Sequence, residues 1–403
     1  MALTQWQTGG RKVVVSHKPE AITISFTEQE LVSYDLAGRY LGSYDHGTNI
    51  RRGLDNTYQQ RWRVVDGRKY HPRQRVLSEQ EAEEHVEDMR IRVRDLLKDK
   101  AAVDSHPATA AVLERIWEYS FRKLMASAGT FTRLYGHIPI LPPDQYRALV
   151  VQMTDGCTYN KCTFCTLYRD KIFRVRTLED FRRHVSEVLE FIGEGLSYRT
   201  SLFLGDANAI AVRTARLLEL VEILNGFPVL QPLVKKGGMH AFLDIYTGNK
   251  KSVDELRLLK EQGLRRVSLG IESGSAALLE FVHKPGSRAD VIDVVRNLKA
   301  AGLSVVTIFM VGLGGHDFRA QHLSDSVSLA QELSLSRGDI VYLSHFSPGT
   351  NAPYLPIASE AGVRAMTADE IDAETRRWKQ VLGEVFGGTG VKVAPYSFQR
   401  FIY

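Results

Sequence analysis

Three cysteines, the only ones in 403 residues, lie within nine positions of one another, at Cys157, Cys162 and Cys165. Thiols used for packing or for disulfides would be scattered along the chain, whereas three in one short loop indicate thiolate ligands. Such a trio suits a cuboidal iron-sulfur cluster that has one iron without a protein ligand, or a zinc ion with a fourth ligand from elsewhere. An odd number of clustered thiols also argues against a disulfide framework and for a reducing compartment.

The rest of the composition is that of an ordinary globular protein, with 44% hydrophobic and 25% charged residues. No apolar run approaches the roughly 20 residues that span a bilayer, and residues 1–5 lack the features of a signal peptide. We therefore expect a cytoplasmic protein without a membrane partner. The formal net charge of +5 is mildly basic and does not by itself imply a nucleic-acid partner.

Between about residues 146 and 350, short apolar runs alternate with amphipathic segments. The apolar runs predict strands at 148–153, 201–204, 240–246, 266–271, 304–311 and 339–343. Because most of these runs are apolar throughout, they are typical of a parallel sheet covered by helices. Periodicity does not decide whether the sheet curls into a partial barrel. In either arrangement, ligands bind at the carboxyl ends of the strands.

The regions on either side of this alternation have other sequence patterns. Residues 1–145 are expected to form an accessory region, with hairpins suggested by the alternation at 21–26 and 31–44. Two helices follow, one opened by the capping box Ser78-x-x-Glu81 and the other near residues 107–128. Residues 351–403 are expected to form a C-terminal extension with a helix near 368–385. The sequence therefore predicts an α/β chain in three parts, 1–145, 146–350 and 351–403.

Polar residues and glycines follow four of the predicted strands. In chain order they are Gly205, Asp206, Asn208, Glu272, Ser273, Gly312 and His345. Because the carboxyl ends of parallel strands meet at one edge, we expect these residues to face the same mouth as the cysteines. Each motif alone is weak, since Asp206 and Ser273 also suit helix caps and His345 also suits a structural role. The glycines after the fifth strand are not followed by Gly-Lys-Ser/Thr, so nucleoside triphosphate binding loses its support.

Taken together, these motifs resemble the radical S-adenosylmethionine (SAM) superfamily. The resemblance rests on Cys162-Thr-Phe-Cys165, Leu204-Gly-Asp206, Leu269-Gly-Ile-Glu-Ser-Gly-Ser275, Lys284 and the glycines after the fifth strand. It covers about half of the chain and is nearest to the branch of Elp3-like, methylthiotransferase and anaerobic coproporphyrinogen oxidase enzymes. That superfamily usually spaces its cysteines C-x3-C-x2-C, whereas four residues separate Cys157 from Cys162 here. A one-residue insertion in a loop costs little free energy.

The resemblance implies a partial (β/α)6 barrel that holds one [4Fe-4S] cluster on the three cysteines, with SAM on the fourth iron. It implies reductive cleavage of SAM to a 5'-deoxyadenosyl radical, hydrogen abstraction from an organic substrate, and a one-electron donor such as a flavodoxin or ferredoxin. It also implies SAM contacts, although Asn208 and His345 carry no assigned part of the molecule. Phe164, Met310 and Gly312 would lie near adenine, Gly205 and Asp206 near the methionyl amine, and Glu272 and Ser273 near the ribose or carboxylate.

The substrate stays open. Eight basic residues between Arg51 and Arg75, interleaved with Tyr58, Trp62 and Tyr70, would suit an anionic substrate or RNA. We favour the interpretation that this segment forms a solvated basic face, because the acidic segment 79–88 follows directly and can neutralise its charge. Within the enzyme class, the alternatives are a tetrapyrrole or polycarboxylate oxidase or decarboxylase, and RNA or nucleotide modification. No cysteine remains for a second cluster, which disfavours methylthiotransferases.

The rival hypothesis is a zinc-bearing, non-catalytic RNA-binding protein. Its fourth zinc ligand would be a histidine such as His137 or His345.

Overall fold

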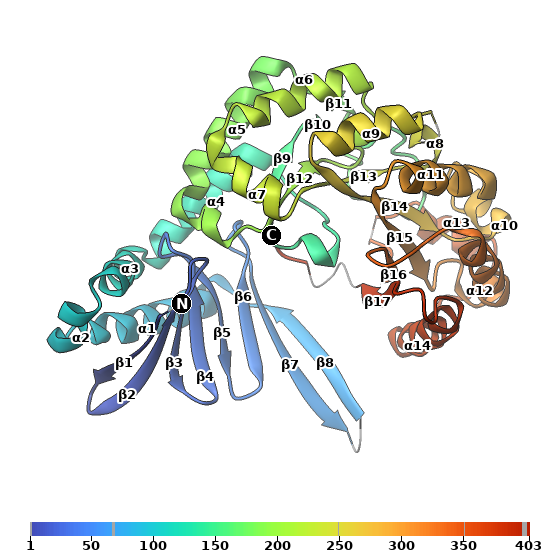
Figure 1. Ribbon diagram of the computed structural model, residues 1–403. Coiled ribbons are helices and arrows are strands. Elements are labelled where there is room, and N and C mark those ends of the chain that lie inside the picture. Colours follow the sequence, from blue (N-terminus) through green and yellow to red (C-terminus); the bar gives the residue numbers. More distant parts are fainter. Residues whose placement is uncertain (1, 67–68, 249, 350, 397–400) are drawn as a thin grey trace. The chain divides into compact units, whose positions relative to one another are not determined.

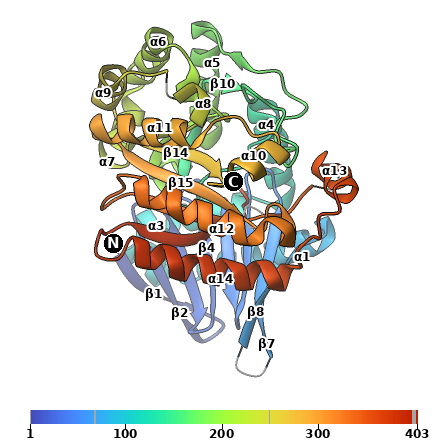
Figure 2. The same ribbon diagram turned by 90° about the vertical axis from the view of Figure 1, so that its right-hand side faces the viewer.

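The computed structural model describes residues 2–66, 69–248, 250–349, 351–396 and 401–403. The chain divides into two compact units, which Figures 1 and 2 show from two sides. We call residues 1–138, 186–200 and 402–403 the sheet unit, and residues 139–185 and 201–401 the barrel unit. The three-part division at residues 145 and 350 stays a prediction.

The sheet unit contains an eight-stranded antiparallel sheet in which each strand pairs with the next along the chain. Its strands are β1 Ala2–Thr8, β2 Arg11–His17, β3 Ile22–Thr27, β4 Glu30–Tyr34, β5 Tyr40–Asp45, β6 Thr48–Arg52, β7 Tyr58–Asp66 and β8 Lys69–Val76. Alternate residues such as Ile22 and Ile24 are fully buried, as expected for strands with one face on a core. The hairpins predicted at 21–26 and 31–44 are part of this sheet.

Four helices follow in the sheet unit, namely α1 Glu79–Leu96, α2 Lys100–Ser105, α3 Pro107–Glu118 and α4 Phe121–Tyr135. The Ser78 and Glu81 capping box opens α1 as the sequence predicts. The single helix predicted near 107–128 is two helices. Ser120 accepts a hydrogen bond from the Lys123 amide at 3.3 Å and thereby caps a new helix.

A buried ion pair ties the sheet to a helix end inside the sheet unit. Arg39 Nε lies 2.8 Å from Asp35 Oδ2, and both side chains are almost fully buried. The guanidinium also donates to the carbonyls of Phe191 and Ile192, the last two residues of α5 (Leu178–Ile192). These carbonyls have no partner within the helix, so Arg39 supplies the missing donors. Gly195 permits this approach, because a Cβ there would lie 2.0 Å from Arg39 Nη2.

The barrel unit is built on a seven-stranded parallel sheet in the order β17-β16-β15-β14-β13-β12-β9. Its strands are β9 Ala148–Gln152, β12 Ser201–Gly205, β13 Met239–Leu243, β14 Leu264–Glu272, β15 Ser304–Val311, β16 Ile340–His345 and β17 Lys392–Tyr396. The first six lie where the apolar runs predict them. The fold class, a partial barrel of alternating strands and helices, is confirmed.

The seventh strand, β17, is not predicted by the sequence. It is short, contains Pro395 and pairs only with β16 among the described residues. Proline lacks the amide hydrogen that a central strand needs, and it is tolerated at an edge. The sequence of residues 392–396, Lys-Val-Ala-Pro-Tyr, therefore shows no clear strand pattern.

Helices connect consecutive strands of the barrel unit. The helix between β9 and β12 is α5, and the others are α6 Thr214–Asn225, α7 Gln231–Lys236, α8 Ile245–Gly248, α9 Val253–Glu261, α10 Ala276–Phe281, α11 Arg288–Ala300, α12 Gly315–Glu332, α13 Tyr354–Glu360 and α14 Ala368–Val385. Capping boxes at Ser252, Ser287 and Thr367 open α9, α11 and α14. Each strand therefore ends at the same edge of the sheet.

No single helix in the described part of the chain has the length and apolar composition to cross a bilayer. Two consecutive helical segments, Thr214–Asn225 and Pro228–Lys236, have the required length and apolar composition only when they are taken together, and the chain bends by 95° between them.

Replacement of Arg39 by Met should lower the free energy of unfolding of the chain by about 3–5 kcal/mol, because it leaves Asp35 buried without its partner. Urea unfolding followed by circular dichroism measures the change. The matched control is Arg75→Met, since Arg75 pairs with Glu81 with both side chains nearly half exposed. Its loss should stay below about 1 kcal/mol. Equal, small losses in both variants would contradict the role assigned to Arg39.

Candidate functional site

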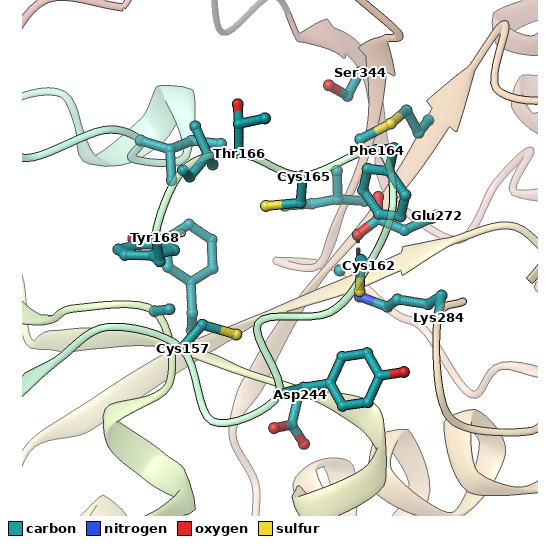
Figure 3. Close-up of a pocket in the computed structure, with 18 of the residues that line it drawn as sticks. Cys157, Cys162, Phe164, Cys165, Thr166, Tyr168, Asp244, Glu272, Lys284 and Ser344 are labelled. Carbon is teal, nitrogen blue, oxygen red and sulfur yellow. Dashed lines mark hydrogen bonds and ion pairs between the residues drawn. The ribbon is translucent and has the colours of Figure 1, made fainter. Parts of the chain in front are cut away.

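A cavity of about 500 Å³ opens at the carboxyl ends of the barrel strands, within the range of about 300–1,000 Å³ of small-molecule sites. Seven predicted site residues line it: Cys157, Cys162, Phe164, Cys165, Asn208, Glu272 and Met310. Figure 3 shows the three cysteines around this one cavity, together with Glu272 and Lys284. The parallel sheet thus brings together residues that are up to 153 positions apart in the sequence.

The cysteines lie on a loop that is closed at its base. Strands β10 (Thr154–Asp155) and β11 (Arg174–Val175) pair on either side of it. Asp155 reinforces this closure through ion pairs of 2.5 Å with Arg174 and 3.2 Å with Arg176. The loop is therefore a closed element that leaves the end of β9 and returns beside it.

Hydrogen bonds within the loop fix the unusual four-residue gap between its first two cysteines. Asn160 has a left-handed backbone with φ of 54°, and its side-chain amide donates to the carbonyls of Tyr168 (2.6 Å) and Lys171 (3.2 Å). Asparagine tolerates this conformation better than most residues. Arg169 donates to the carbonyls of Cys162 at 2.6 Å and Cys165 at 3.0 Å. The extra residue is thus absorbed by a local turn.

A polar network ties the loop to the ends of β12 and β13. Thr158, which follows Cys157, donates to Asp244 Oδ2 at 3.0 Å and accepts from the Asn208 side-chain amide at 2.9 Å. The Tyr246 hydroxyl lies 3.0 Å from the same Thr158 oxygen. Asp244 also accepts from the Thr247 amide at 2.6 Å. Because both Asp244 oxygens have partners within the chain, this carboxylate positions the loop.

A buried ion pair stands opposite, at the end of β14. Glu272 Oε1 lies 3.3 Å from Lys284 Nζ, and both side chains are about 90% buried. Glu272 has a left-handed φ of 64°, which is rare outside glycine and is frequent at ligand sites. Burial lowers the pKa of Lys284, but the carboxylate of Glu272 and the nearby thiols outweigh it and raise the pKa overall.

Burial disfavours the thiolate form of two of the three cysteines. Burial raises the pKa of Cys162 to about 11 and also raises the pKa of Cys165. Thiols bind metals as thiolates, so metal binding must release these protons. None of the three cysteines forms a disulfide and all are partly accessible, which suits metal ligands.

Five predicted site residues do not line the cavity: Gly205, Asp206, Ser273, Gly312 and His345. The Asp206 carboxylate accepts hydrogen bonds from Lys171 Nζ at 3.1 Å and Gln152 Nε2 at 3.1 Å. Ser273 Oγ lies 2.7 Å from His322 Nδ1, and His345 Nδ1 lies 3.6 Å from Asp372. A Cβ on Gly312 would meet Ile371 at 2.9 Å. Their contacts with SAM stay predictions.

Sequence reasoning missed several residues that line the cavity, among them Asp244, Tyr246, Phe242, Ile308, Phe346 and Tyr396. Asp244 was missed because the third strand is predicted at 240–246, whereas the structure ends β13 at Leu243 and places Asp244 directly after it. The apolar residues carry no such signal, because an apolar side chain in a strand is equally typical of the core.

The metal-binding potential of the cavity differs from that of a zinc site. In the described part of the chain, no three Cys, His, Asp or Glu side chains are close enough together to hold one metal ion. A tetrahedral zinc site needs all its ligand atoms within about 2.3 Å of a single ion. In a cluster, each thiolate binds a different iron. Three thiols that line one cavity without converging on a point fit a cluster.

Comparison with known proteins agrees with this chemistry. Residues 151–325, from the end of β9 to α12, match the radical SAM superfamily. This part of the chain is a radical SAM domain. Domains of this superfamily are enzyme domains that use a [4Fe-4S] cluster and SAM, so the predicted superfamily and cofactors are confirmed.

The relatives of this chain have names that indicate different reactions. An uncharacterized methyltransferase of Pyrococcus horikoshii is 26% identical over 218 residues, which are 52% of this chain and 43% of the relative. A tRNA-2-methylthio-N(6)-dimethylallyladenosine synthase of Prosthecochloris aestuarii is 25% identical over 64% of this chain and 56% of its own length. The chain thus spans about half the length of these curated relatives. Coproporphyrinogen III oxidase of Escherichia coli covers 63% of this chain and is itself covered to 55%, with a TM-score of 0.43 at 14% identity.

The basic segment 51–75 belongs to the sheet unit, and none of its described residues lines the cavity. Arg52 is buried and donates to Asn56, and Tyr58 is buried in the core. Arg75 pairs with Glu81 of the acidic helix α1, as the solvated-face hypothesis expects. Arg68 lies outside the described residues.

Replacement of Asn160 by Ala should lower the iron bound after anaerobic reconstitution at least twofold. Alanine pays about 1–2 kcal/mol for the left-handed backbone and cannot donate to the two carbonyls. Asn160→Gly keeps the conformation and should bind an intermediate amount. Colorimetric iron and sulfide assays measure both. The control is Asn56→Ala, a left-handed asparagine of the sheet unit with φ of 63°. If the Asn160→Ala variant binds as much iron as the wild type, the role assigned to this turn is contradicted.

Proposed function

We propose that this protein is a single-cluster radical SAM enzyme that abstracts hydrogen from an organic substrate with a largely apolar reacting part. The observation that carries the proposal is the position of Cys157, Cys162 and Cys165 around one cavity at the strand ends of a radical SAM domain. With the cluster and SAM bound, the cofactors supply a 5'-deoxyadenosyl radical, formed by one-electron cleavage of the sulfonium.

The residues of the chain have distinct tasks in this proposal. The three thiolates hold the cluster, and Thr158, Asn160 and Arg169 hold the loop that presents them. Phe164 and Met310 offer apolar contact to the adenine. Lys284 and Glu272 offer complementary charges to the polar groups of SAM, inside a site where such contacts are stronger than in water.

The wall of the cavity favours an apolar substrate. Beyond the cysteine loop its apolar lining includes Ile140, Phe242, Ile308, Phe346 and Tyr396, and its charged side chains are Asp244, Glu272 and Lys284. Among the described residues, no arginine lines it, and its one lysine is paired with Glu272. A polycarboxylate such as a porphyrinogen would face Asp244 and Glu272 without compensating cations, so the proposal sets aside the anionic substrate. An apolar wall also excludes water, which protects a reactive carbon radical.

The reaction type beyond hydrogen abstraction is left to product analysis. The relatives are a methyltransferase and a methylthio-adenosine synthase by name, and these reactions need different partners. The three cysteines of this chain are all required for the one cluster, which disfavours a reaction with a second all-cysteine cluster.

Anaerobically reconstituted protein should hold about four irons per chain and, when reduced, convert SAM to 5'-deoxyadenosine. Liquid chromatography with mass detection measures the product. Cys162→Ala should abolish it, while circular dichroism shows that the variant is folded. In the same assay, apolar aromatic compounds should stimulate SAM cleavage more than polycarboxylates do.

Two outcomes would overturn the proposal. A colourless protein that binds zinc and no iron would favour the RNA-binding alternative. A loaded cluster that leaves SAM intact under reduction would remove the enzymatic role.

A further inference from the structure

The outer side of the cysteine loop combines basic side chains with one exposed apolar side chain. Ile172 is 89% exposed, more than any other large apolar residue in the described part of the chain. Lys161, Arg169 and Arg174 are exposed on the same loop or at its base. Residues 161–176 contain five basic residues and one acidic residue, Asp170. We call Lys161, Arg169, Ile172 and Arg174 the loop patch.

The carboxylates that pair with this segment lie beneath it. Asp155, the partner of Arg174, has a side chain that is 15% exposed, whereas that of Arg174 is 67% exposed. Asp206, the partner of Lys171, is 3% exposed. In these pairs solvent therefore meets the cations more than the anions. Asp170 is the one exposed carboxylate of the segment, so the loop patch has a net positive charge.

The loop patch is connected directly to the cysteines. The Arg169 guanidinium donates to the carbonyls of Cys162 and Cys165. A Cβ added to Gly156, the residue before Cys157, would lie 3.2 Å from the backbone of Ile172. Each of the three cysteines is thus within one residue or one hydrogen bond of the exposed patch. A partner that covers the patch therefore lies over the loop that carries the three thiols.

We propose that the loop patch is the docking surface for a small acidic protein that carries one electron, such as a flavodoxin. This inference rests on the proposed function, which requires one electron from outside the chain. Transient electron-transfer complexes bury small interfaces and rely on charge steering for fast association. Exposed basic side chains that share a loop with one exposed apolar side chain suit that kind of encounter. The same basic segment also offsets the negative charge of the thiolates, but that role does not require Ile172 to be exposed.

The test measures how fast the reconstituted cluster is reduced, by stopped-flow absorbance, with reduced flavodoxin and separately with reduced methyl viologen. Ile172→Glu and Lys161→Glu place negative charge in the patch without removing a cysteine or the Arg169 bonds. Each should lower the second-order rate constant with flavodoxin at least tenfold at low salt. Each should leave the rate with methyl viologen within twofold of the wild type, because a small dye needs no docking surface.

Val229→Glu is the matched control, since Val229 is an apolar residue of the same unit that is 52% exposed. The cluster of this variant should be reduced at the wild-type rate by both donors. The wild-type rate with flavodoxin should also fall with ionic strength. Equal flavodoxin rates in all three variants, or a cluster that accepts electrons from the dye and none from flavodoxin, would overturn this inference alone. A protein that assembles no cluster would instead overturn the proposed function.

Discussion

The site depends on one constraint: three thiols from a single short loop must face one cavity. A loop of this length has many conformations, and ordering it costs about 1–2 kcal/mol of backbone entropy per residue. The chain offsets that cost with contacts on every side of the loop. The β10–β11 pair closes its base, Asn160 and Arg169 hold its interior, and Thr158 joins it to Asp244. Thr163 adds a fourth anchor through its hydrogen bonds with the Val282 carbonyl.

The parallel sheet supplies what the loop alone lacks. Since every strand of the barrel unit ends at the same edge, Asn208, Asp244, Glu272 and Met310 reach the cavity from four different strands or the loops after them. The strands themselves are buried and apolar, so the polar groups at their ends are the chemically informative part. This arrangement lets a rigid scaffold combine polar side chains from the strand ends with an apolar lining such as Phe242 and Ile308.

The sequence predicts the sheet well, because fully buried strands appear as short apolar runs between helical patterns. Six of the seven parallel strands were predicted in this way, and β17 was missed because Pro395 and Lys392 give an edge strand little apolar character. The cysteines, Glu272 and Met310 were predicted as site residues from motif and strand position. Side chains such as Phe242 and Ile308 were not, since whether an apolar strand residue faces the core or a cavity depends on the curvature of the sheet. Asp206 and Ser273 show the converse, because polar residues at strand ends also serve as internal hydrogen-bond partners.

The most direct test of this account is the electron paramagnetic resonance spectrum of the reduced, reconstituted protein with and without SAM. If three cysteines hold a cluster whose fourth iron binds SAM, the reduced protein gives a [4Fe-4S]⁺ signal, and SAM shifts its g values. A spectrum that SAM leaves unchanged, or the absence of any cluster signal from folded protein, would contradict the central claim.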